Sequence, residues 1–449
     1  MKFFGTDGIR GNSSKFPFDN ITLRIIGMSI IEFFGNVKPV LIIRDTRKSG
    51  ERIQKNIAYG IIDMGATPIF CGIMPTSSAS LFLKEGVYSV AIVISASHNE
   101  YIDNGIKIFN YNGIKIDDLI ELEIEKKINN KLAIKNNDSI NIYKQTKNVF
   151  IREKKINIYK SFILENFTGK NLNGKKIILD CANGVSYKYA PSILKKLGAD
   201  VIALNTSPNG KNINLNCGVL FPKKTINAVK KYKAFCGFIF DGDADRLICI
   251  DENGNVKDGD FFLASMMLWL VKKKKINNIL VTTLMSNIGF VTFLKSKNID
   301  IIFSDVGDKY IIQSMEKNKA YFGGEQSGHF IFRNILPTGD GMLSAIMMLS
   351  ALCDTNSKMS VFMDVFKKKP QIIINKTVNA KIPFKKLTYT SKLIENYKKS
   401  LKKHERIIVR YSGTENIVRI MVDGEDYKKI EKIAKNIAYS IEKEIIVYI

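Results

Sequence analysis

Three aspartates alternate with small residues in the stretch Asp241-Gly242-Asp243-Ala244-Asp245, which follows an apolar run over residues 236–240. Glycine and alanine leave the carboxylates accessible, and three carboxylates this close repel one another unless a cation holds them. Oxygen ligands of this kind favour Mg²⁺. We therefore expect a magnesium site here, with a solvated acidic turn as the alternative. Arg246, next in the chain, suits contact with a phosphate group.

A calcium-binding EF-hand loop is a further alternative for the same stretch, because Glu252 stands where that loop has its twelfth-position ligand. Two observations reject it. The sixth position is Arg246 rather than the glycine that the turn needs, and the flanking residues have the pattern of strands rather than helices.

A serine, Ser97, stands shortly after the β-branched run over residues 90–94, a pattern typical of a strand buried on both faces. Open α/β sheets bind ligands at the carboxyl ends of their strands, so Ser97 is a candidate nucleophile. An ordinary turn stabilised by side-chain oxygens is one alternative. A Ser-His hydrolase is another, disfavoured because neighbouring residues point in different directions and His98 need not reach the Ser97 hydroxyl.

A glycine between two hydroxyl residues, Ser412-Gly413-Thr414, lies between Arg410 and Arg419. Glycine lets backbone N–H groups turn inward, the hydroxyls donate hydrogen bonds, and an arginine fork can grip phosphate with two bonds. The sequence predicts an anion-binding loop here. A β-turn with solvated arginines is the alternative.

A second polar loop, over residues 322–329, offers hydrogen-bonding side chains at alternating positions in Glu325, Ser327 and His329. This spacing suits the hydroxyl edge of a sugar, although an ordinary glycine-rich loop would look similar. The chain has three histidines, and two of them, His98 and His329, fall inside these motifs. A serine nucleophile, a divalent metal and a phosphate-binding loop together indicate phosphoryl transfer, which needs charge neutralisation and alignment above all.

Alternating strands and helices must position these loops. We expect strands at 40–43, 68–71, 90–94 and 106–109, a turn at 103–105, and a helix at 50–64. Further strands are expected at 176–180, 200–204, 236–240, 278–282 and 406–410, with a helix at 259–272 and another at the end of the chain. This alternation implies largely parallel sheets, and each block presents one polar loop at a strand end.

The composition excludes several classes. A chain of 449 residues with 45% hydrophobic and 25% charged residues is expected to form three or four folded domains. No apolar run is long enough for a membrane span, and the N-terminus turns polar too early for a signal peptide. The six cysteines are scattered without a CxxC pair, which favours free thiols in a reducing cytoplasm.

A formal net charge of +25 raises the alternative of a nucleic-acid-binding protein. The excess is mostly lysine spread along the chain, and isoleucine and asparagine are abundant too. All three have AT-rich codons, so a biased genome explains the charge without a polyanionic partner. We therefore expect no nucleic-acid partner.

Five motifs, in this order along essentially the whole chain, resemble those of the α-D-phosphohexomutase superfamily: FGTDGIRG, ISASHN followed by NGIK, DGDADR, GGEQSGH and RYSGTEN. Within it they are most similar to the bacterial phosphoglucosamine mutases. The resemblance implies three similar mixed α/β sheet domains and a smaller α+β C-terminal domain, heart-shaped around a central cleft. The implied domains are a phosphoserine domain (1–150), a metal-binding domain (151–252), a sugar-recognition domain (253–368) and a phosphate-binding domain (369–449).

The resemblance also implies roles for individual residues. Ser97 would be the phosphoserine and would hold one Mg²⁺ together with Asp241, Asp243 and Asp245. Lys107 matches the general-base position, with His98 and Arg10 beside it. The implied substrate-binding residues are Arg246, Glu325, Ser327, His329, Arg410, Ser412, Gly413, Thr414 and Arg419.

The implied reaction is an isomerisation that interconverts glucosamine 6-phosphate and glucosamine 1-phosphate through a 1,6-bisphosphate, in the cytoplasm, for UDP-N-acetylglucosamine and peptidoglycan synthesis. The implied partner is a small phosphosugar, and the implied state is a monomer or homodimer without membrane contact. Phosphomannomutase or phosphoglucomutase activity is the alternative within the superfamily. One residue departs from the family pattern, because Glu100 stands where proline usually follows Ser-His-Asn.

Overall fold

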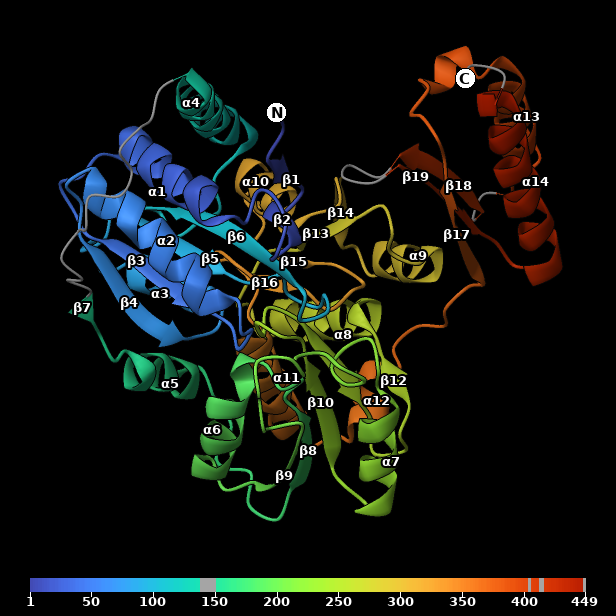
Figure 1. Ribbon diagram of the computed structural model, residues 1–449. Helices are drawn as coiled ribbons and strands as arrows, with labels where there is room; N and C mark the ends of the chain where they lie inside the picture. The colour runs from blue at the N-terminus through green and yellow to red at the C-terminus, as the bar shows by residue number, and fades with distance from the viewer. Residues whose placement is uncertain (138–150, 403–404, 412–415, 447–449) are drawn as a thin grey trace.

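The computed structural model describes residues 1–137, 151–402, 405–411 and 416–446. Their strands form four separate sheets of seven, five, four and three strands, and each sheet belongs to one successive unit of the chain (Figure 1). This arrangement confirms the expected three larger α/β units and the smaller C-terminal unit.

The first unit contains the seven-stranded sheet, in the order β1-β2-β6-β5-β3-β4-β7. Its strands are β1 (Phe4–Gly5), β2 (Gly8–Asn12), β3 (Val40–Arg44), β4 (Pro68–Ile73), β5 (Val90–Ile94), β6 (Asp103–Asn110) and β7 (Ile151–Arg152). Its helices are α1 (Asn20–Phe34), α2 (Gly50–Asp63), α3 (Ser77–Leu83) and α4 (Asp118–Asn137). Because β3 runs parallel to β4 and β5 while β6 runs antiparallel to both β5 and β2, the sheet is mixed.

Strand β5 explains how this sheet is covered. Its five residues are all buried, as the sequence predicts. Ile92 and Ile94 pack in the cluster that includes α1, α2 and α4, whereas Ala91 and Val93 pack in the cluster on the other face. The period of two along a strand sends alternate residues to opposite faces. Ser97 therefore follows a strand that is covered on both sides.

The predicted turn at 103–105 is wrong, because Asp103, Asn104 and Gly105 are the first residues of β6. They pair with β2, where Gly11 lies opposite Asn104 and Arg10 opposite Gly105. Pairing with a distant strand has overridden the local turn preference of an Asp-Asn-Gly sequence.

The second and third units follow the same alternating plan. The second has α5 (Ile156–Glu165), β8 (Lys176–Asp180), a 3₁₀ turn (Val185–Lys188), α6 (Ala190–Lys196), β9 (Asp200–Leu204), α7 (Lys223–Lys231), β10 (Cys236–Phe240), β11 (Leu247–Ile250) and β12 (Val256–Lys257). The third has α8 (Gly259–Lys272), β13 (Ile279–Thr283), α9 (Ile288–Ser296), β14 (Asp300–Ser304), α10 (Asp308–Lys317), β15 (Phe322–Gly324), β16 (Phe330–Phe332), α11 (Gly341–Thr355) and α12 (Met359–Met363).

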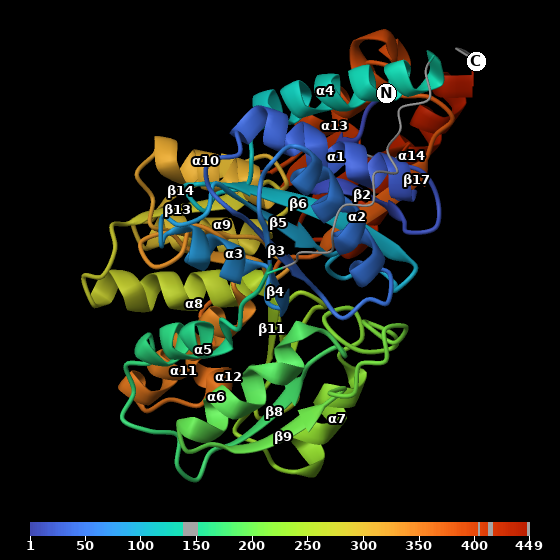
Figure 2. The ribbon, with the colours of Figure 1, turned by 60° about the vertical axis from the view of Figure 1, so that its left-hand side comes forward.

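The C-terminal unit is smaller and lies apart from the sheet of the second unit in both views (Figures 1 and 2). It contains β17 (Gln371–Thr377), a 3₁₀ turn (Phe384–Lys386), α13 (Thr388–Lys399), β18 (Arg406–Tyr411), β19 (Ile417–Asp423) and α14 (Tyr427–Ile446). The sheet is antiparallel in the order β17-β19-β18. Its apolar residues form a cluster of their own, whereas the largest apolar cluster runs through all three preceding units.

Two expectations from composition can be checked against the described residues. All six cysteines are free, and five of them are buried. Within the described ranges, no helix is both long and apolar enough to cross a bilayer.

Candidate active site

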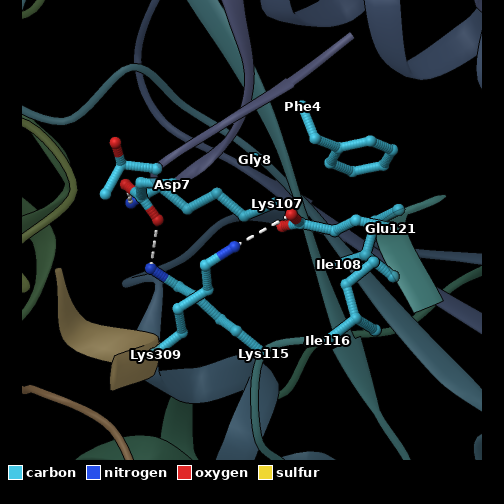
Figure 3. Close-up of a pocket in the computed structure, with 10 residues that line it drawn as sticks. Phe4, Asp7, Gly8, Lys107, Ile108, Lys115, Ile116, Glu121 and Lys309 are labelled. Atoms are coloured by element: carbon cyan, nitrogen blue, oxygen red, sulfur yellow. Dashed lines mark hydrogen bonds and ion pairs between the residues drawn. The ribbon is translucent and has the colours of Figure 1, made fainter. Parts of the chain in front are cut away.

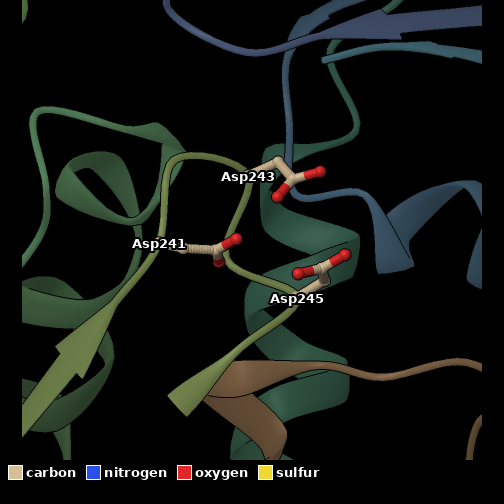
Figure 4. Close-up of side chains that lie close together, drawn as sticks. All are labelled: Asp241, Asp243 and Asp245. Carbon is tan, nitrogen blue, oxygen red and sulfur yellow. The ribbon is translucent and has the colours of Figure 1, made fainter. Parts of the chain in front are cut away.

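The three aspartates of the DGDADR motif lie close together in the loop after β10 (Figure 4). All three are buried, and one carboxylate oxygen from each lies within 4.8 Å of the others. Among the described residues, one buried oxygen of Asp243 and one of Asp245 have no hydrogen-bond partner. Burial, followed by repulsion from Asp245 and Asp243, raises the pKa of Asp241 well above its usual range. These buried acceptors fit a hard divalent cation such as Mg²⁺.

Ser97, in the first unit, contacts this triad of the second unit. Its Oγ donates a hydrogen bond of 2.5 Å to Asp241, and the serine is 1% exposed. His98 lies closer than its position in the sequence indicates, because its Nδ1 is 3.3 Å from the same Oγ. Burial, followed by the positive charges of Arg246 and Arg10, lowers the pKa of His98 to about 3. His98 is therefore a neutral neighbour of Ser97 at physiological pH.

Lys107, on β6, connects the aspartate loop at 241–245, called the metal loop below, with Asp7 near the start of the chain. Its ammonium lies 2.8 Å from Asp243, 3.3 Å from Asp245 and 3.4 Å from Asp7. Burial opposes the charge, but Asp243, Asp7 and Asp245 outweigh it and hold the pKa of Lys107 well above its usual value. Lys107 is a cation in this arrangement, and its role as a proton carrier stays a prediction. Arg10 is paired with Asp7.

A chain of alternating charges continues from Asp7 into the third unit. Lys115 pairs with both Asp7 and Asp308, and His329 lies between Asp308 and Asp245 at 3.8 and 3.9 Å. Figure 3 shows the small pocket beside it, where Lys115 reaches Asp7 and Lys309 reaches Glu121. Three units of the chain thus meet around the metal loop.

The GGEQSGH loop joins β15 to β16 and lies beside this centre. Glu325 is buried and accepts hydrogen bonds from the Gly307 amide at 3.2 Å and from the Ser327 hydroxyl at 3.2 Å. Arg246 and His329 form a backbone bridge that places the loop against the metal loop. The structure therefore brings together the predicted residues of the serine, metal and sugar motifs.

Arg410 and Arg419 lie directly opposite each other on β18 and β19. Like charges at opposite positions of two strands destabilise a sheet unless an anion lies between them. In the described part of the chain, a buried guanidinium nitrogen of each lacks a hydrogen-bond partner. Burial, followed by the charge of Arg419, lowers the pKa of Arg410. This pair suits a phosphate group, whereas the predicted Ser412, Gly413 and Thr414 lie outside the described residues.

Several residues of the centre were not predicted as site residues from the sequence. Thr76 donates a hydrogen bond of 2.5 Å to Asp243 from the start of α3, Asp7 binds Lys107 and Lys115, and Asp308 pairs with Lys115. Asp7 belongs to the FGTDGIRG motif, in which the resemblance implies a role for Arg10 but none for the aspartate. Nothing in the local sequence of Thr76 indicates its partner.

Comparisons with known proteins agree with this geometry. Family models described as phosphoglucomutase/phosphomannomutase alpha/beta/alpha domains I, II and III match residues 1–135, 157–254 and 258–369, and the C-terminal domain of the same family matches residues 366–440. The chain belongs to the phosphoglucomutase/phosphomannomutase family. It is thus an enzyme of the phosphohexomutase type, and the resemblance noted from the motifs is confirmed.

Within the family, the chain is similar over its full length to proteins named phosphoglucosamine mutase. The chain is 37% identical to a phosphoglucosamine mutase of Chlamydia caviae over 449 residues, covering 99% of this chain and 97% of the relative. It is 39% identical to a phosphoglucosamine mutase of Campylobacter curvus over 439 residues, covering 96% and 97%.

Solved structures of phosphohexomutases share the fold. A phosphoglucomutase/phosphomannomutase family protein from Burkholderia thailandensis superposes with a TM-score of 0.79 at 20% identity, covering 98% of this chain and 97% of that one. An N-acetylphosphoglucosamine mutase from Aspergillus fumigatus, solved in complex with GlcNAc-6P and magnesium, gives a TM-score of 0.67 at 16% identity, covering 99% and 96%.

Proposed function

We propose that the chain is a phosphoglucosamine mutase, which interconverts glucosamine 6-phosphate and glucosamine 1-phosphate in the cytoplasm and so supplies UDP-N-acetylglucosamine for peptidoglycan. One observation carries the proposal: the Ser97 hydroxyl donates to Asp241 of a buried aspartate triad on another unit. A serine in contact with a metal loop can carry a phosphoryl group next to the cation that neutralises it. The full-length relatives named phosphoglucosamine mutase support the choice of sugar.

In the proposed reaction, a sugar hydroxyl attacks the phosphorus on Ser97. The bond from phosphorus to the serine oxygen breaks, a bond to the sugar oxygen forms, and the hydroxyl proton passes to the enzyme. The resulting 1,6-bisphosphate turns in the central cleft. Ser97 then takes the other phosphoryl group, and the freed sugar oxygen recovers the proton. Sugar and enzyme each end with as many phosphoryl groups as they had at the start.

The described residues divide this work by position. Asp241, Asp243, Asp245 and the Ser97 phosphate would hold Mg²⁺, which supplies positive charge against the transferring phosphoryl group. Lys107 is the proposed proton carrier: Mg²⁺ on Asp243 and Asp245 would offset the carboxylate charges that keep this lysine protonated, so that it could accept the hydroxyl proton. The charges of Arg10 and Arg246 are near His98 beside Ser97.

The remaining residues would bind the sugar and its other phosphate. Glu325, Ser327 and His329 face the sugar hydroxyls in this proposal. Arg410 and Arg419, with Ser412, Gly413 and Thr414, hold the phosphate that is not reacting. The four units would correspond to the boundaries 1–150, 151–252, 253–368 and 369–449, and the state would be a monomer or homodimer.

A coupled assay on glucosamine 6-phosphate, with a catalytic amount of glucosamine 1,6-bisphosphate and Mg²⁺, tests this proposal. We expect turnover with glucosamine phosphate to exceed that with mannose or glucose phosphates. A preference for mannose or glucose phosphate would favour phosphomannomutase or phosphoglucomutase activity instead. Salt-dependent DNA binding without any mutase activity would refute the enzyme and support a nucleic-acid-binding protein.

A further inference from the structure

The backbone of the nucleophile is held in an unusual conformation. Ser97 has φ 53°, in the left-handed region that residues other than glycine rarely adopt. Such a conformation costs free energy and persists only where surrounding contacts determine it. The contacts that hold this loop therefore decide where the Ser97 hydroxyl points.

Arg47, just after β3, gathers the carbonyl groups of this loop. Its side chain is completely buried, and its guanidinium donates to the Ser97 carbonyl at 3.0 Å and to the Asn99 carbonyl at 2.9 Å. The same group donates to the Asp103 carbonyl at 3.1 Å and to the Glu100 carbonyl. The planar fork of an arginine has five N–H donors in fixed directions, which a lysine cannot reproduce.

Asp45 neutralises Arg47 and holds the amide side of the same loop. The Arg47 Nε lies 2.9 Å from one Asp45 oxygen, and the Arg47 amide donates to the other at 2.9 Å. Asp45 also accepts a hydrogen bond of 2.7 Å from the Ser95 hydroxyl, whose oxygen accepts the Ser97 amide at 2.9 Å. The Ser97 carbonyl is thus bound by Arg47 directly, and the Ser97 amide is bound through Ser95 to Asp45, the partner of Arg47 in a buried ion pair.

Asn214 holds the same carbonyls from the second unit. Its side-chain amide donates to the Ser97 carbonyl at 2.8 Å and to the Asn99 carbonyl at 3.0 Å. The contact lies in a junction where Thr46 donates to the Asn183 carbonyl at 2.7 Å and the Lys48 amide donates to the Gly210 carbonyl at 2.9 Å. The Ser97 loop is therefore clamped between two units of the chain.

We propose that Arg47 and Asn214 are positioning residues for phosphoryl transfer at Ser97. Neither belongs to the residues that would contact the transferring phosphoryl group in the proposed reaction. Together they fix the carbonyl side of the Ser97 loop, so that the hydroxyl faces Asp241 across the junction. The kinetic part of this proposal rests on the proposed function, in which Ser97 carries the phosphoryl group.

The first test replaces Arg47 with lysine, which keeps the charge opposite Asp45 but lacks the fork. We expect Arg47→Lys to lower kcat by about 10- to 100-fold with little change in KM, because a small misplacement of the nucleophile costs about that much in rate. Arg52→Lys is the matched control. Arg52 donates to the Phe18 and Ser13 carbonyls in the same unit rather than to the carbonyls that Arg47 holds, and we expect Arg52→Lys to keep the wild-type kcat.

The second test replaces Asn214 with aspartate, which cannot donate and places a carboxylate against two carbonyl oxygens. We expect a kcat loss in Asn214→Asp at least as large as in Arg47→Lys, and a smaller loss in Asn214→Ala. Asn278→Asp is the control, because Asn278 donates to the Asn298 carbonyl far from Ser97 in the chain. A wild-type kcat in both Asn214 variants would overturn the proposal.

Hydrogen exchange of the amides at 95–100 separates this proposal from the proposed function, because it needs no substrate. We expect about tenfold faster exchange in Arg47→Lys and Asn214→Asp than in the wild type, with no change in the two controls. Unchanged exchange in both test variants would overturn the proposal, even if the wild type were active. A wild type inactive on all sugar phosphates would refute the proposed function, while exchange would still decide whether these residues hold the loop. If Arg47→Lys does not fold, the two Asn214 variants decide kcat, and Asn214→Asp decides the exchange.

Discussion

The junction around Ser97 and the attachment of the C-terminal unit are built differently. The first three units share one buried apolar cluster, which includes Leu41, Phe238 and Leu349. The C-terminal unit has a separate cluster, which includes Ile407 and Ile437. Units that share a core resist motion relative to one another. A unit with its own core can move as a whole when its contacts with the rest of the chain are small.

Among the described residues, the attachment of the C-terminal unit is small and mostly polar. Asn287 donates to the Lys369 carbonyl at 2.9 Å and accepts the Lys369 amide at 3.0 Å. Gln371 donates to the Met285 carbonyl at 3.2 Å, and Arg406 donates to the Ser286 carbonyl at 2.6 Å. The loop at 285–287 thus contacts Lys369 just before β17, the first residue of β17 and the first residue of β18.

This difference matches the two tasks of the proposed reaction. Phosphoryl transfer needs its nucleophile and metal ligands held within fractions of an ångström, which a shared core provides. A clamp that must release and grip again while the bisphosphate turns needs a unit that can move. The residues proposed to react lie at the junction, and the facing Arg410 and Arg419 lie on the C-terminal unit, which has the small attachment.

The largest effect is expected from removing the nucleophile at the junction. Ser97→Ala should lower kcat by about ten-thousandfold or more, because no other group takes the phosphoryl group. The Ser89 hydroxyl, at the opposite end of β5, donates to the Lys38 and Pro39 carbonyls, so Ser89→Ala should keep wild-type turnover. Intact mass should show an added phosphoryl group on active wild type and none on Ser97→Ala. Fully active protein without that group would contradict the assignment.

Metal removal should have the next largest effect. Exhaustive chelation, or Asp243→Asn, should lower kcat by about a thousandfold, since the cation supplies several kcal/mol of charge stabilisation. Calorimetry should show that Asp243→Asn has lost Mg²⁺ binding as well as activity. Asp200→Asn, at an exposed end of β9, should keep both. Full activity after chelation would refute the metal assignment.

Much of the fold could be predicted from the sequence, because its strands are short apolar runs between polar stretches. The runs at Val90–Ile94, Lys176–Asp180 and Cys236–Phe240 have the predicted bounds. Strand β6 begins three residues earlier than predicted, because its first residues depend on pairing with β2, which local sequence does not report. Register between distant strands is a tertiary property.

The site divides in the same way. Ser97 and the aspartate triad stand out because each motif is continuous in the chain. Thr76 and Asn214 do not, since their partners Asp243 and Ser97 are 167 and 117 residues away. Arg47 could have been found by the rule that predicted Ser97, because it also follows a buried strand. That rule finds positions at the edge of a sheet, but not the carbonyl groups to which a buried arginine donates.

On the C-terminal unit, Arg410→Gln should weaken substrate binding more than turnover. We expect kcat/KM to fall by about 10- to 100-fold, mainly through KM, because the non-reacting phosphate loses a charged hydrogen-bond donor. Without substrate, thermal stability should not fall, since Arg419 loses a like-charged neighbour. Lys376→Gln is the control on the same sheet, where Lys376 pairs with Glu442. An unchanged KM in Arg410→Gln would contradict the proposal that Arg410 and Arg419 bind the non-reacting phosphate.

The attachment loop has a pH-dependent support in Asp260, which accepts the Asn287 amide and the Gln326 side chain, each at 2.9 Å. Burial, followed by the charge of Asp258, raises the pKa of Asp260 from 3.8 to about 7, against the opposing charge of Lys368. A raised folded-state pKa means that the folded protein holds the proton more tightly than the unfolded chain does. Its stabilising contribution is therefore complete below about pH 4 and disappears as pH rises towards 7.

Asp260→Asn should remove that slope, because asparagine stays uncharged. Unfolding free energies measured from pH 4 to 8 should show the wild type losing stability relative to Asp260→Asn by on the order of 4 kcal/mol up to pH 7, about 1.4 kcal/mol for each pH unit, with no further change above. Asp200→Asn should follow the wild type in parallel. Parallel profiles for Asp260→Asn and the wild type would show that Asp260 does not titrate in this range.

The smallest effect is expected at Glu100, where the family usually has proline. Proline would fix φ, yet here the Glu100 carbonyl is held by Arg47, so the loop does not depend on a ring for its restraint. The Glu100 side chain is exposed, which suits a carboxylate near a serine that we propose carries phosphate. At about 8 Å from a phosphate charge, it would cost roughly 2 kcal/mol at an effective dielectric near 20, but only about 0.5 kcal/mol in bulk water.

Because Glu100 is exposed, the smaller of these costs applies. Glu100→Gln and Glu100→Pro should each change kcat/KM by less than about tenfold, or 1.4 kcal/mol. A larger gain in Glu100→Gln alone would show that the phosphate senses the charge despite the solvent. A larger loss in both variants would give the side chain a working role. A loss confined to Glu100→Pro would instead show that the ring moves the carbonyl away from Arg47, which would itself locate the restraint in the guanidinium.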